Sequence, residues 1–345
     1  MVTEIFLVDK DSQAVLKKAA ELLQNGSLVA IPTETVYGLG ANALDGKACL
    51  EIFKAKGRPS DNPLIVHISD PRDAEKIAFT NPLYYALAEK FMPGPLTIIL
   101  PKKSNIPSEV TAGLDSVAIR CPVHPVANEL IRIAGIPIAA PSANSSGKPS
   151  PTTAGHVLDD MNGKIPLILD GGECDVGVES TVIKITDNEI VLLRPGAVTV
   201  EMLKSVCSNV SVAQAVKEEL KAGEKPLSPG MKYKHYAPKA DLYLIDDECV
   251  SFIEYVRHKQ AQENCAVMCY DEEIELLENK NLLPVGSKND IKNQTKKLFI
   301  LLREADKLCV DTVYAHLPSD EGESLAIYNR MIRACAHRIV KQKEV

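Results

Sequence analysis

The chain has 345 residues, of which 45% are hydrophobic and 25% are charged, so it has the ordinary profile of a globular protein with room for two domains. A formal net charge of -7 gives no global electrostatic case for nucleic-acid binding, and nine scattered cysteines argue against a disulfide framework or a zinc site. Because no basic leader or membrane-length apolar run is evident, we expect a cytoplasmic protein without membrane contact.

The first strong pattern is an apolar run at 27–31, which follows a predicted helix over 11–25 and predicts a buried strand. This strand opens into the loop 32–40, which contains hydroxyls, one carboxylate and two glycines. Cations and amides at 54–62 then precede a second predicted strand, 64–68. Hydroxyls, cations and glycines in loops at the ends of strands predict a site for a small anionic ligand, although any one such loop could be only a turn.

The rest of the N-terminal part continues to alternate strands and helices. Further helices are predicted near 47–55, 84–91, 125–134 and 153–161, and strands at 96–100, 117–120, 136–140, 166–169, 180–185 and 190–193. This order predicts an α/β fold with a mixed, twisted, open sheet and helices packed on it. Since the polar motifs lie at strand ends, we expect them to converge on one rim of the sheet.

The alternation of predicted strands and helices weakens after residue 204 and becomes regular again from about residue 242. We predict a linker over 205–238 whose ordered part, Ser228–Pro238, folds back over the site. Strands at 242–245, 266–270, 283–285 and 312–315 alternate with helices at 250–262, 272–279, 291–308 and 325–340. The expected domains are therefore 1–204, 205–238 and 239–345, the last a smaller, parallel, Rossmann-like α/β domain.

Several common nucleotide and catalytic motifs are absent from the sequence. The first C-terminal strand is followed by acidic residues 246–248 instead of a Gly-x-Gly-x-x-Gly loop, so we expect no pyrophosphate there. No P-loop, protein metal cluster or nucleophile elbow is found. Any Mg²⁺ is therefore expected to arrive with a triphosphate and not in a protein cage.

A series of motifs in the first 240 residues resembles the threonylcarbamoyl-AMP synthase family, the enzymes with a YrdC-like domain. The segments that carry the resemblance are 32–40, 53–59, 61–68, 116–120, 137–144, 177–182, 193–196 and 228–238, the last resembling the linker of the two-domain form. The resemblance implies that L-threonine, bicarbonate or CO2, and ATP are joined to give L-threonylcarbamoyl-AMP and pyrophosphate. It also implies a role in tRNA modification with a downstream threonylcarbamoyl transferase, and it leaves direct tRNA contact open.

The resemblance also implies a set of site residues. The L-threonine pocket takes Thr35, His67, Arg120, Ala140 and Ser180. The ATP side takes Arg58, Asn62, Ser116, Ser142, Ser150, Arg194, His235 and Tyr236, with Lys56 and Arg58 as the catalytic cations. Such chemistry needs positioning and charge neutralisation, and no covalent enzyme nucleophile.

Other interpretations remain open at this point. From the residues alone, Arg120 equally suits a surface salt bridge, His67 a buried core position and Ser116 a cap. A double-stranded RNA or tRNA-binding module without catalysis is the main alternative function. A carbamoyl-transfer enzyme of the hydrogenase-maturation type is a second, although paired Cys-x-x-Cys motifs are missing. A separate ligand for 241–345 is a third.

Overall fold

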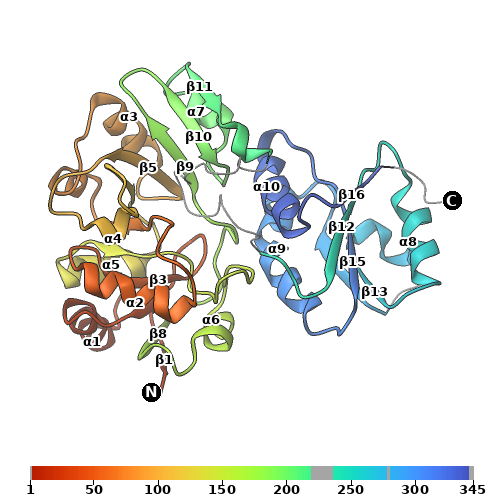
Figure 1. Ribbon diagram of the computed structural model, residues 1–345, viewed down its shortest axis with the longest axis horizontal. Coiled ribbons are helices and arrows are strands. Elements are labelled where there is room, and N and C mark those ends of the chain that lie inside the picture. The colour runs from red at the N-terminus through yellow and green to blue at the C-terminus, as the bar shows by residue number, and fades with distance from the viewer. Residues whose placement is uncertain (1, 219–235, 278–279, 342–345) are drawn as a thin grey trace. The chain divides into compact units, whose positions relative to one another are not determined.

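The computed structural model describes residues 2–218, 236–277 and 280–341 (Figure 1). Contacts between Cα atoms divide the chain into two compact units. The first holds the described residues up to 218 except 147–149, and the second holds 147–149 and the described residues from 236 onward.

The first unit is built on one large mixed sheet. In the described residues its strand order is β1-β8-β2-β3-β7-β4-β6-β5-β9-β10-β11. These strands are β1 (Glu4–Leu7), β2 (Val29–Ile31), β3 (Gly38–Asn42), β4 (Ile65–His67), β5 (Leu96–Pro101), β6 (Ser116–Arg120), β7 (Ile138–Ala139), β8 (Leu167–Asp170), β9 (Thr181–Ile185), β10 (Ile190–Arg194) and β11 (Val210–Val212). Parallel and antiparallel pairs alternate irregularly along the sheet, which confirms the predicted mixed architecture.

Helices cover this sheet only in part. They are α1 (Gln13–Gln24), α2 (Gly46–Lys56), α3 (Pro82–Phe91), α4 (Ser108–Thr111), α5 (Pro125–Ala134), α6 (Ala154–Met161) and α7 (Val200–Lys204), with short 3-10 turns η1 (Pro71–Lys76) and η2 (Gln214–Val216). The buried faces of α1 and α5 pack together on β2, β7 and β8. A smaller apolar patch on β4, β5, β6, β9 and β10 lies beyond these two helices and consists of Ile65, Ile99, Ala118, Val182 and Leu193.

The helix α2 shows how local sequence places a candidate residue. Asp45 caps its start by accepting the backbone N–H groups of Lys47 and Ala48. Gly57 ends it in the left-handed conformation, with φ of 65°, which glycine adopts at no steric cost. The chain therefore turns sharply after Lys56, the last residue of the helix.

The strand β3 was not expected, because its residues lie in a loop in the sequence-based prediction. It pairs antiparallel with β2, so Val29 lies opposite Gly40. A Cβ atom at Gly40 would lie 3.0 Å from Ile138 and 3.2 Å from the Val29 carbonyl oxygen. The glycine is thus required for close packing within the sheet, although glycine disfavours strands on average.

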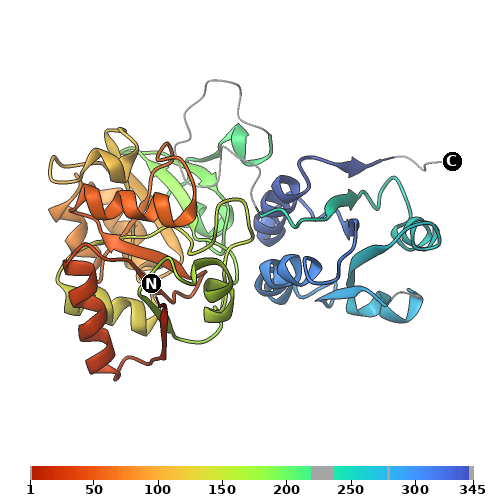
Figure 2. The ribbon, with the colours of Figure 1, turned by 60° about the horizontal axis from the view of Figure 1, so that its bottom comes forward.

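The second unit is a smaller parallel sheet, as predicted. Its described strands are β12 (Asp241–Ile245), β13 (Cys265–Tyr270), β14 (Leu282–Gly286), β15 (Thr312–His316) and β16 (Ile339–Val340), in the order β14-β13-β15-β12-β16. Its helices are α8 (Phe252–Gln260), α9 (Ile291–Ala305) and α10 (Leu325–Ala334), with 3-10 turns η3 (Asp271–Leu276) and η4 (Gly322–Ser324). Figures 1 and 2 show the sheet between α8 on one side and α9 with α10 on the other.

Two predicted C-terminal helices were wrong in part. The range 325–340 is helical only to Ala334, because Ala336 and His337 take positive φ values of 49° and 59° that turn the chain into β16. The range 272–279 forms only the 3-10 turn η3, and residues 278–279 lie outside the described residues.

The range predicted as a linker, 205–238, is described only in part. Its beginning carries β11, which pairs with β10 and so extends the first sheet past residue 204. Residues 219–235 lie outside the described residues, and the predicted domain boundaries stay a prediction.

Candidate active site

One face of the first sheet carries a row of polar side chains. Arg120 on β6 is paired in register with Thr97 on β5 and with His67 on β4. Residues paired directly across neighbouring strands have side chains on the same face, so these three project to one side. Ser180 lies just before β9, and Arg194 ends β10 next to it. The register of five strands therefore brings distant segments to one place.

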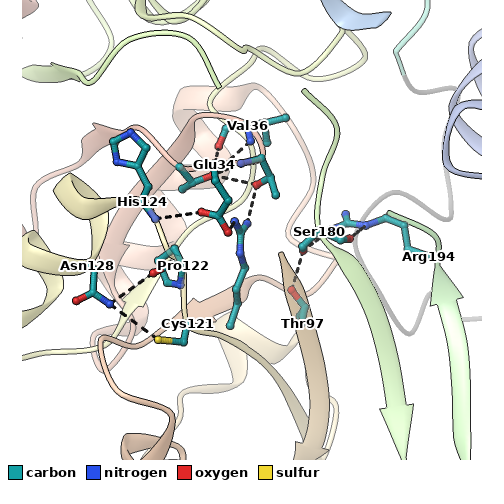
Figure 3. A network of polar contacts seen from close by, with 12 residues as sticks. Glu34, Val36, Thr97, Cys121, Pro122, His124, Asn128, Ser180 and Arg194 are labelled. Carbon is teal, nitrogen blue, oxygen red and sulfur yellow. Dashed lines mark hydrogen bonds and ion pairs between the residues drawn. The ribbon is translucent and has the colours of Figure 1, made fainter. Parts of the chain in front are cut away.

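The guanidinium of Arg120 is held by the loop that leads into β3. Its Nη2 donates to Glu34 Oε1 at 2.6 Å, and its Nη1 donates to Thr35 Oγ1 at 2.8 Å. Glu34 Oε2 also accepts the backbone N–H of His124 at 3.4 Å (Figure 3). The Arg120 and Glu34 side chains are 4% and 6% exposed, so this is a buried ion pair. The Arg120 Nε is also buried, and it has no hydrogen-bond partner within the described residues.

Burial and charge fix the ionisation of the groups beside Arg120. Burial by itself would raise the pKa of Glu34, but the charge and hydrogen bond of Arg120 outweigh it and keep that pKa below its usual value. Burial, with the nearby charge of Arg120, lowers the pKa of His67 to about 3. The imidazole of His67 is therefore neutral at pH 7, and its Nδ1 lies 3.1 Å from the Ile65 carbonyl oxygen. Glu34 is ionised.

Ser180 connects the strands β5 and β10. Its hydroxyl lies 2.7 Å from Thr97 Oγ1 and accepts from Arg194 Nη2 at 3.2 Å (Figure 3). Arg194 Nε also donates to the Ser180 carbonyl oxygen at 3.0 Å. Ala140, the remaining residue of the predicted threonine pocket, is buried and donates its backbone N–H to Ile65 O at 2.9 Å. Ser180 and Arg194 thus form one rigid unit.

Lys56 is buried and holds the loop after β7. Its Nζ donates to the carbonyl oxygens of Ser142 and Asn144, at 2.5 and 2.7 Å. Ser142 Oγ in turn donates to Asn144 Oδ1 at 2.5 Å. Burial, followed by the charge of Arg58, lowers the pKa of Lys56 well below its ordinary value. The Lys56 amine group is thereby fixed against the loop that carries Ser142.

Arg58 and Asn62 lie next to each other before β4. Arg58 is half-buried, its Nη2 donates to Asn62 O at 3.1 Å, and its guanidinium lies 5.3 Å from the centre of the Phe53 ring. The Asn62 side chain is 1% exposed, and neither its Nδ2 nor its Oδ1 has a partner among the described residues. Leaving such buried polar groups unpaired costs about 1–3 kcal/mol, so this amide requires a hydrogen-bonding partner, which a ligand or a water molecule can supply.

Two other residues predicted for the ATP side are Ser116 and Ser150. Ser116 begins β6, and Asn62 lies just before β4. Because these two strands are parallel, both residues lie at the same edge of the sheet. At ~3.3 Å per residue, Ser116 is about 13 Å along β6 from Arg120. Ser150 is buried, and its hydroxyl donates to Glu179 Oε1 at 2.5 Å. The site therefore has an Arg120 end and an Asn62 end.

The two predicted linker residues are His235 and Tyr236. His235 lies outside the described residues. Tyr236 belongs to the second unit, where it is buried and stacks on Phe299 with ring centres 5.0 Å apart. A role for either residue in ATP binding stays a prediction.

Three residues of the site were missed by the sequence-based prediction. Glu34, Thr97 and Glu179 each bond directly to a predicted residue. Glu34 was detectable, because a carboxylate in a loop expected to bind an anion must neutralise a nearby cation. Thr97 and Glu179 gave no such signal, since their partners lie more than twenty residues away in sequence.

A second polar cluster lies at the carboxyl edge of the second sheet. His316 ends β15, and its Nδ1 and Nε2 lie 2.8 and 2.9 Å from carboxylate oxygens of Asp247 and Glu273. Its ring stacks on Phe252 and on Tyr270, with centres 3.6 and 4.4 Å apart. Burial would lower the pKa of His316, but the two carboxylates together raise it. The cluster is therefore an internally satisfied ion-pair network.

Two further findings limit what the molecule contains. In the described ranges, His, Cys, Asp and Glu side chains form no group of three or more suited to hold a metal ion. None of the helices in the part of the chain that the structure describes combines the length and apolar character needed to cross a membrane.

Comparison with known proteins agrees with this geometry. Residues 21–196 match the Sua5, YciO and YrdC family, described as "Telomere recombination", and residues 198–336 match "Threonylcarbamoyl-AMP synthase, C-terminal domain". Threonylcarbamoyl-AMP synthase from Bacillus subtilis is 44% identical over 333 residues, which covers 94% of both chains. The enzyme of that name from Pyrococcus abyssi is 43% identical, covering 94% of this chain and 95% of the relative.

A solved structure extends the similarity to the whole fold. The crystal structure of P. abyssi Sua5 complexed with L-threonine superposes with a TM-score of 0.86 at 40% identity, covering 98% of both chains. Sequence and structure thus agree over both units, including the parallel sheet of the second. The chain belongs to the threonylcarbamoyl-AMP synthase family.

Proposed function

We propose that this protein is an L-threonylcarbamoyl-AMP synthase, which converts L-threonine, bicarbonate or CO2, and ATP into L-threonylcarbamoyl-AMP and pyrophosphate. The full-length similarity to curated synthases supports the overall reaction. The single structural observation that carries the proposal is the two-ended site on the first sheet. One end has a buried arginine beside small hydroxyls, and the other has cations beside an unpartnered amide.

The Arg120 end suits an amino acid. The Arg120 guanidinium is the natural partner for an α-carboxylate, and its Nε is buried without a protein partner. Thr35 and Ser180 offer hydroxyls, and His67 offers a neutral imidazole that can hydrogen-bond the threonine hydroxyl or amine. Ala140 leaves room for the small side chain. That P. abyssi Sua5 was crystallised with L-threonine supports this choice of amino acid.

The Asn62 end suits ATP. Lys56 and Arg58 supply positive charge for the phosphates, and Arg194, which ends β10 beside Ser180, supplies more. Hydroxyls of Ser116, Ser142 and Ser150, with the orphan amide of Asn62, supply hydrogen bonds. The apolar patch that contains Ile65 and Ala118 lies on the same face and suits the nucleoside. His235 and Tyr236 are proposed to close over it.

The chemistry requires positioning more than it requires a reactive side chain. The threonine ammonium first loses a proton to solvent, and the neutral amine then attacks CO2 and releases a second proton to give a carbamate. The carbamate oxygen attacks the α-phosphorus in line as pyrophosphate leaves. The negative charge that develops on the leaving group is met by Lys56, Arg58 and Arg194. Mg²⁺ enters with the triphosphate, and it supplies further charge neutralisation there.

The product is a mixed anhydride and must be used quickly. We propose that a downstream transferase uses it to modify adenosine in tRNA, so that the reaction occurs in the cytoplasm. Direct contact of this chain with tRNA is the alternative role, a binding module without catalysis. The described site favours catalysis, because Lys56, Arg120 and Arg194 are buried at the ends of separate elements and do not form an exposed basic surface.

The test is pyrophosphate release that requires both threonine and bicarbonate, with the adenylate identified by mass spectrometry. Arg58→Ala and Arg120→Ala should abolish turnover while thermal unfolding still shows a folded protein. Arg132→Ala is the matched control, because that arginine is 64% exposed and bonds Glu129 in a surface pair. A wild-type protein that binds tRNA but releases no pyrophosphate would favour the binding module and contradict the proposal.

A further inference from the structure

The charges at the Arg120 end balance each other. Glu34 and Arg120 form an ion pair with an N–O distance of 2.6 Å, at 6% and 4% exposure. His67 is uncharged at pH 7, and burial likewise lowers the pKa of His124, the other histidine that faces Glu34. Among the described residues a further cation, Arg194, is bonded to Ser180 and lies level with Arg120 but three strands away, on β10. The Glu34–Arg120 pair, with the two neutral histidines beside it, therefore has no net charge.

Glu34 also restrains the Arg120 guanidinium. One of its carboxylate oxygens takes Nη2, and the other is anchored to the backbone N–H of His124. Thr35 takes Nη1, and Thr35 is itself 2.9 Å from Thr33, whose hydroxyl donates to the Val36 carbonyl oxygen at 2.6 Å. Only Nε of the guanidinium is buried without a partner in the described residues. The loop thus presents one defined edge of the arginine.

We infer that Glu34 is a positioning residue that fixes Arg120 and makes the amino-acid end selective for a zwitterionic α-amino acid over a simple carboxylate. The inference rests on the proposed function and names how the same site selects its substrate class. A buried charge is favourable only when it is compensated. An amino acid brings both an ammonium and a carboxylate, which match Glu34 and Arg120. A carboxylate without the amine adds an unbalanced negative charge beside Glu34, which disfavours its binding.

The test compares L-threonine with 3-hydroxybutyrate, which is threonine without its amino group. Pyrophosphate release gives KM for threonine, and inhibition gives Ki for 3-hydroxybutyrate. The wild type should bind 3-hydroxybutyrate on the order of tenfold or more weakly than threonine. Glu34→Gln keeps the shape and removes the charge, so the ratio of the two constants should fall toward one. Glu34→Asp keeps the charge and shortens the side chain, so the ratio should persist while kcat falls.

The outcomes separate this inference from its alternatives. A wild type that binds both ligands equally would overturn it without any variant, even if the Gln variant failed to fold. An unchanged ratio in Glu34→Gln, or an equal loss of the ratio in both variants, would also overturn it. The KM for ATP should be unchanged in both variants, whereas a merely structural role of Glu34 would move it. Absence of pyrophosphate release in the wild type would instead refute the proposed function.

Discussion

Gly196 offers a sharp test of how rigidly the site is held. It follows Arg194-Pro195, and a Cβ atom built on it would lie 2.5 Å from the Thr181 backbone nitrogen, 2.8 Å from the Glu179 carbonyl oxygen and 2.9 Å from the Ser180 carbonyl carbon. Ordinary contact begins near 3.4 Å, so the Gly196→Ala variant must move this backbone by up to 0.9 Å, the difference between 3.4 and 2.5 Å. All three obstructing atoms belong to the main chain, so no side-chain rotation relieves the clash.

Two effects should follow in Gly196→Ala. Overpacking of this kind lowers the free energy of unfolding by about 1–3 kcal/mol. Displacement of Ser180 by about 0.5 Å and of Thr181 by about 0.9 Å should also lower kcat/KM for threonine by roughly tenfold to a hundredfold, since misplacement near 1 Å disrupts substrate positioning. Urea unfolding measures the first effect, and threonine-dependent pyrophosphate release measures the second.

The matched control is Gly155→Ala in α6. Its new Cβ would lie 3.7 Å from Thr153 Oγ1, an ordinary contact, and alanine in a helix gains about 0.5–1 kcal/mol over glycine. This variant should therefore be as active as the wild type and no less stable. If Gly196→Ala matched Gly155→Ala in both assays, the segment 179–181 would have to be mobile, and the reasoning from close packing would be wrong.

Three further predictions concern buried charge and metal. Lys56→Met removes the donor to the loop after β7, which should lower the free energy of unfolding by about 1–3 kcal/mol and reduce pyrophosphate release at least tenfold; an unchanged rate would contradict the role of Lys56. Because Asp247 and Glu273 raise the pKa of His316 despite its burial, its stabilising effect is complete below pH ~6.5 and is lost as the pH rises through the higher folded-state pKa. The free energy of unfolding of the second unit, measured with urea, should therefore fall from pH 6 toward alkaline pH in the wild type and fall less in His316→Gln. An equal fall in both proteins would refute this. Chelation of Mg²⁺ with EDTA should stop pyrophosphate release without changing the melting temperature, whereas a fall in melting temperature would indicate a metal held by the protein.

Much of the fold could be predicted because its elements are local. The helix α5 has a proline at its start and Gly135 in the left-handed conformation at its end, and both signals are visible in the sequence. The strand β3 could not be predicted in this way, because its glycines are selected by packing against β2 and β7 and not by strand preference. The end of α10 was missed for a similar reason, since nothing in the sequence marks Ala336 and His337 for positive φ.

The candidate site likewise has a part that could be predicted from the sequence and a part that could not. The resemblance supplied residues such as Arg120 and Asn62, and the register of the sheet brings Arg120 beside His67 and Thr97. What the sequence did not supply is the set of contacts that hold those residues. Glu34 on Arg120 and Thr97 on Ser180 join residues more than eighty positions apart, and such pairs depend on the tertiary fold. The resemblance could thus nominate residues for the ligand, whereas of their supports only Glu34 carried a signal in the sequence.

The supports matter because the proposed reaction has no covalent intermediate on the enzyme. Its acceleration must then come from charges that are in place before the reaction begins. In the proposed site, Arg120, Lys56 and Arg194 are each at most 6% exposed, and each bonds at least one loop or strand-end residue distant in sequence. Such cations lose little freedom when the ligand binds. A lysine at position 120 or 194 would keep the charge but lose the planar set of donors, so either variant should be less active than the wild type.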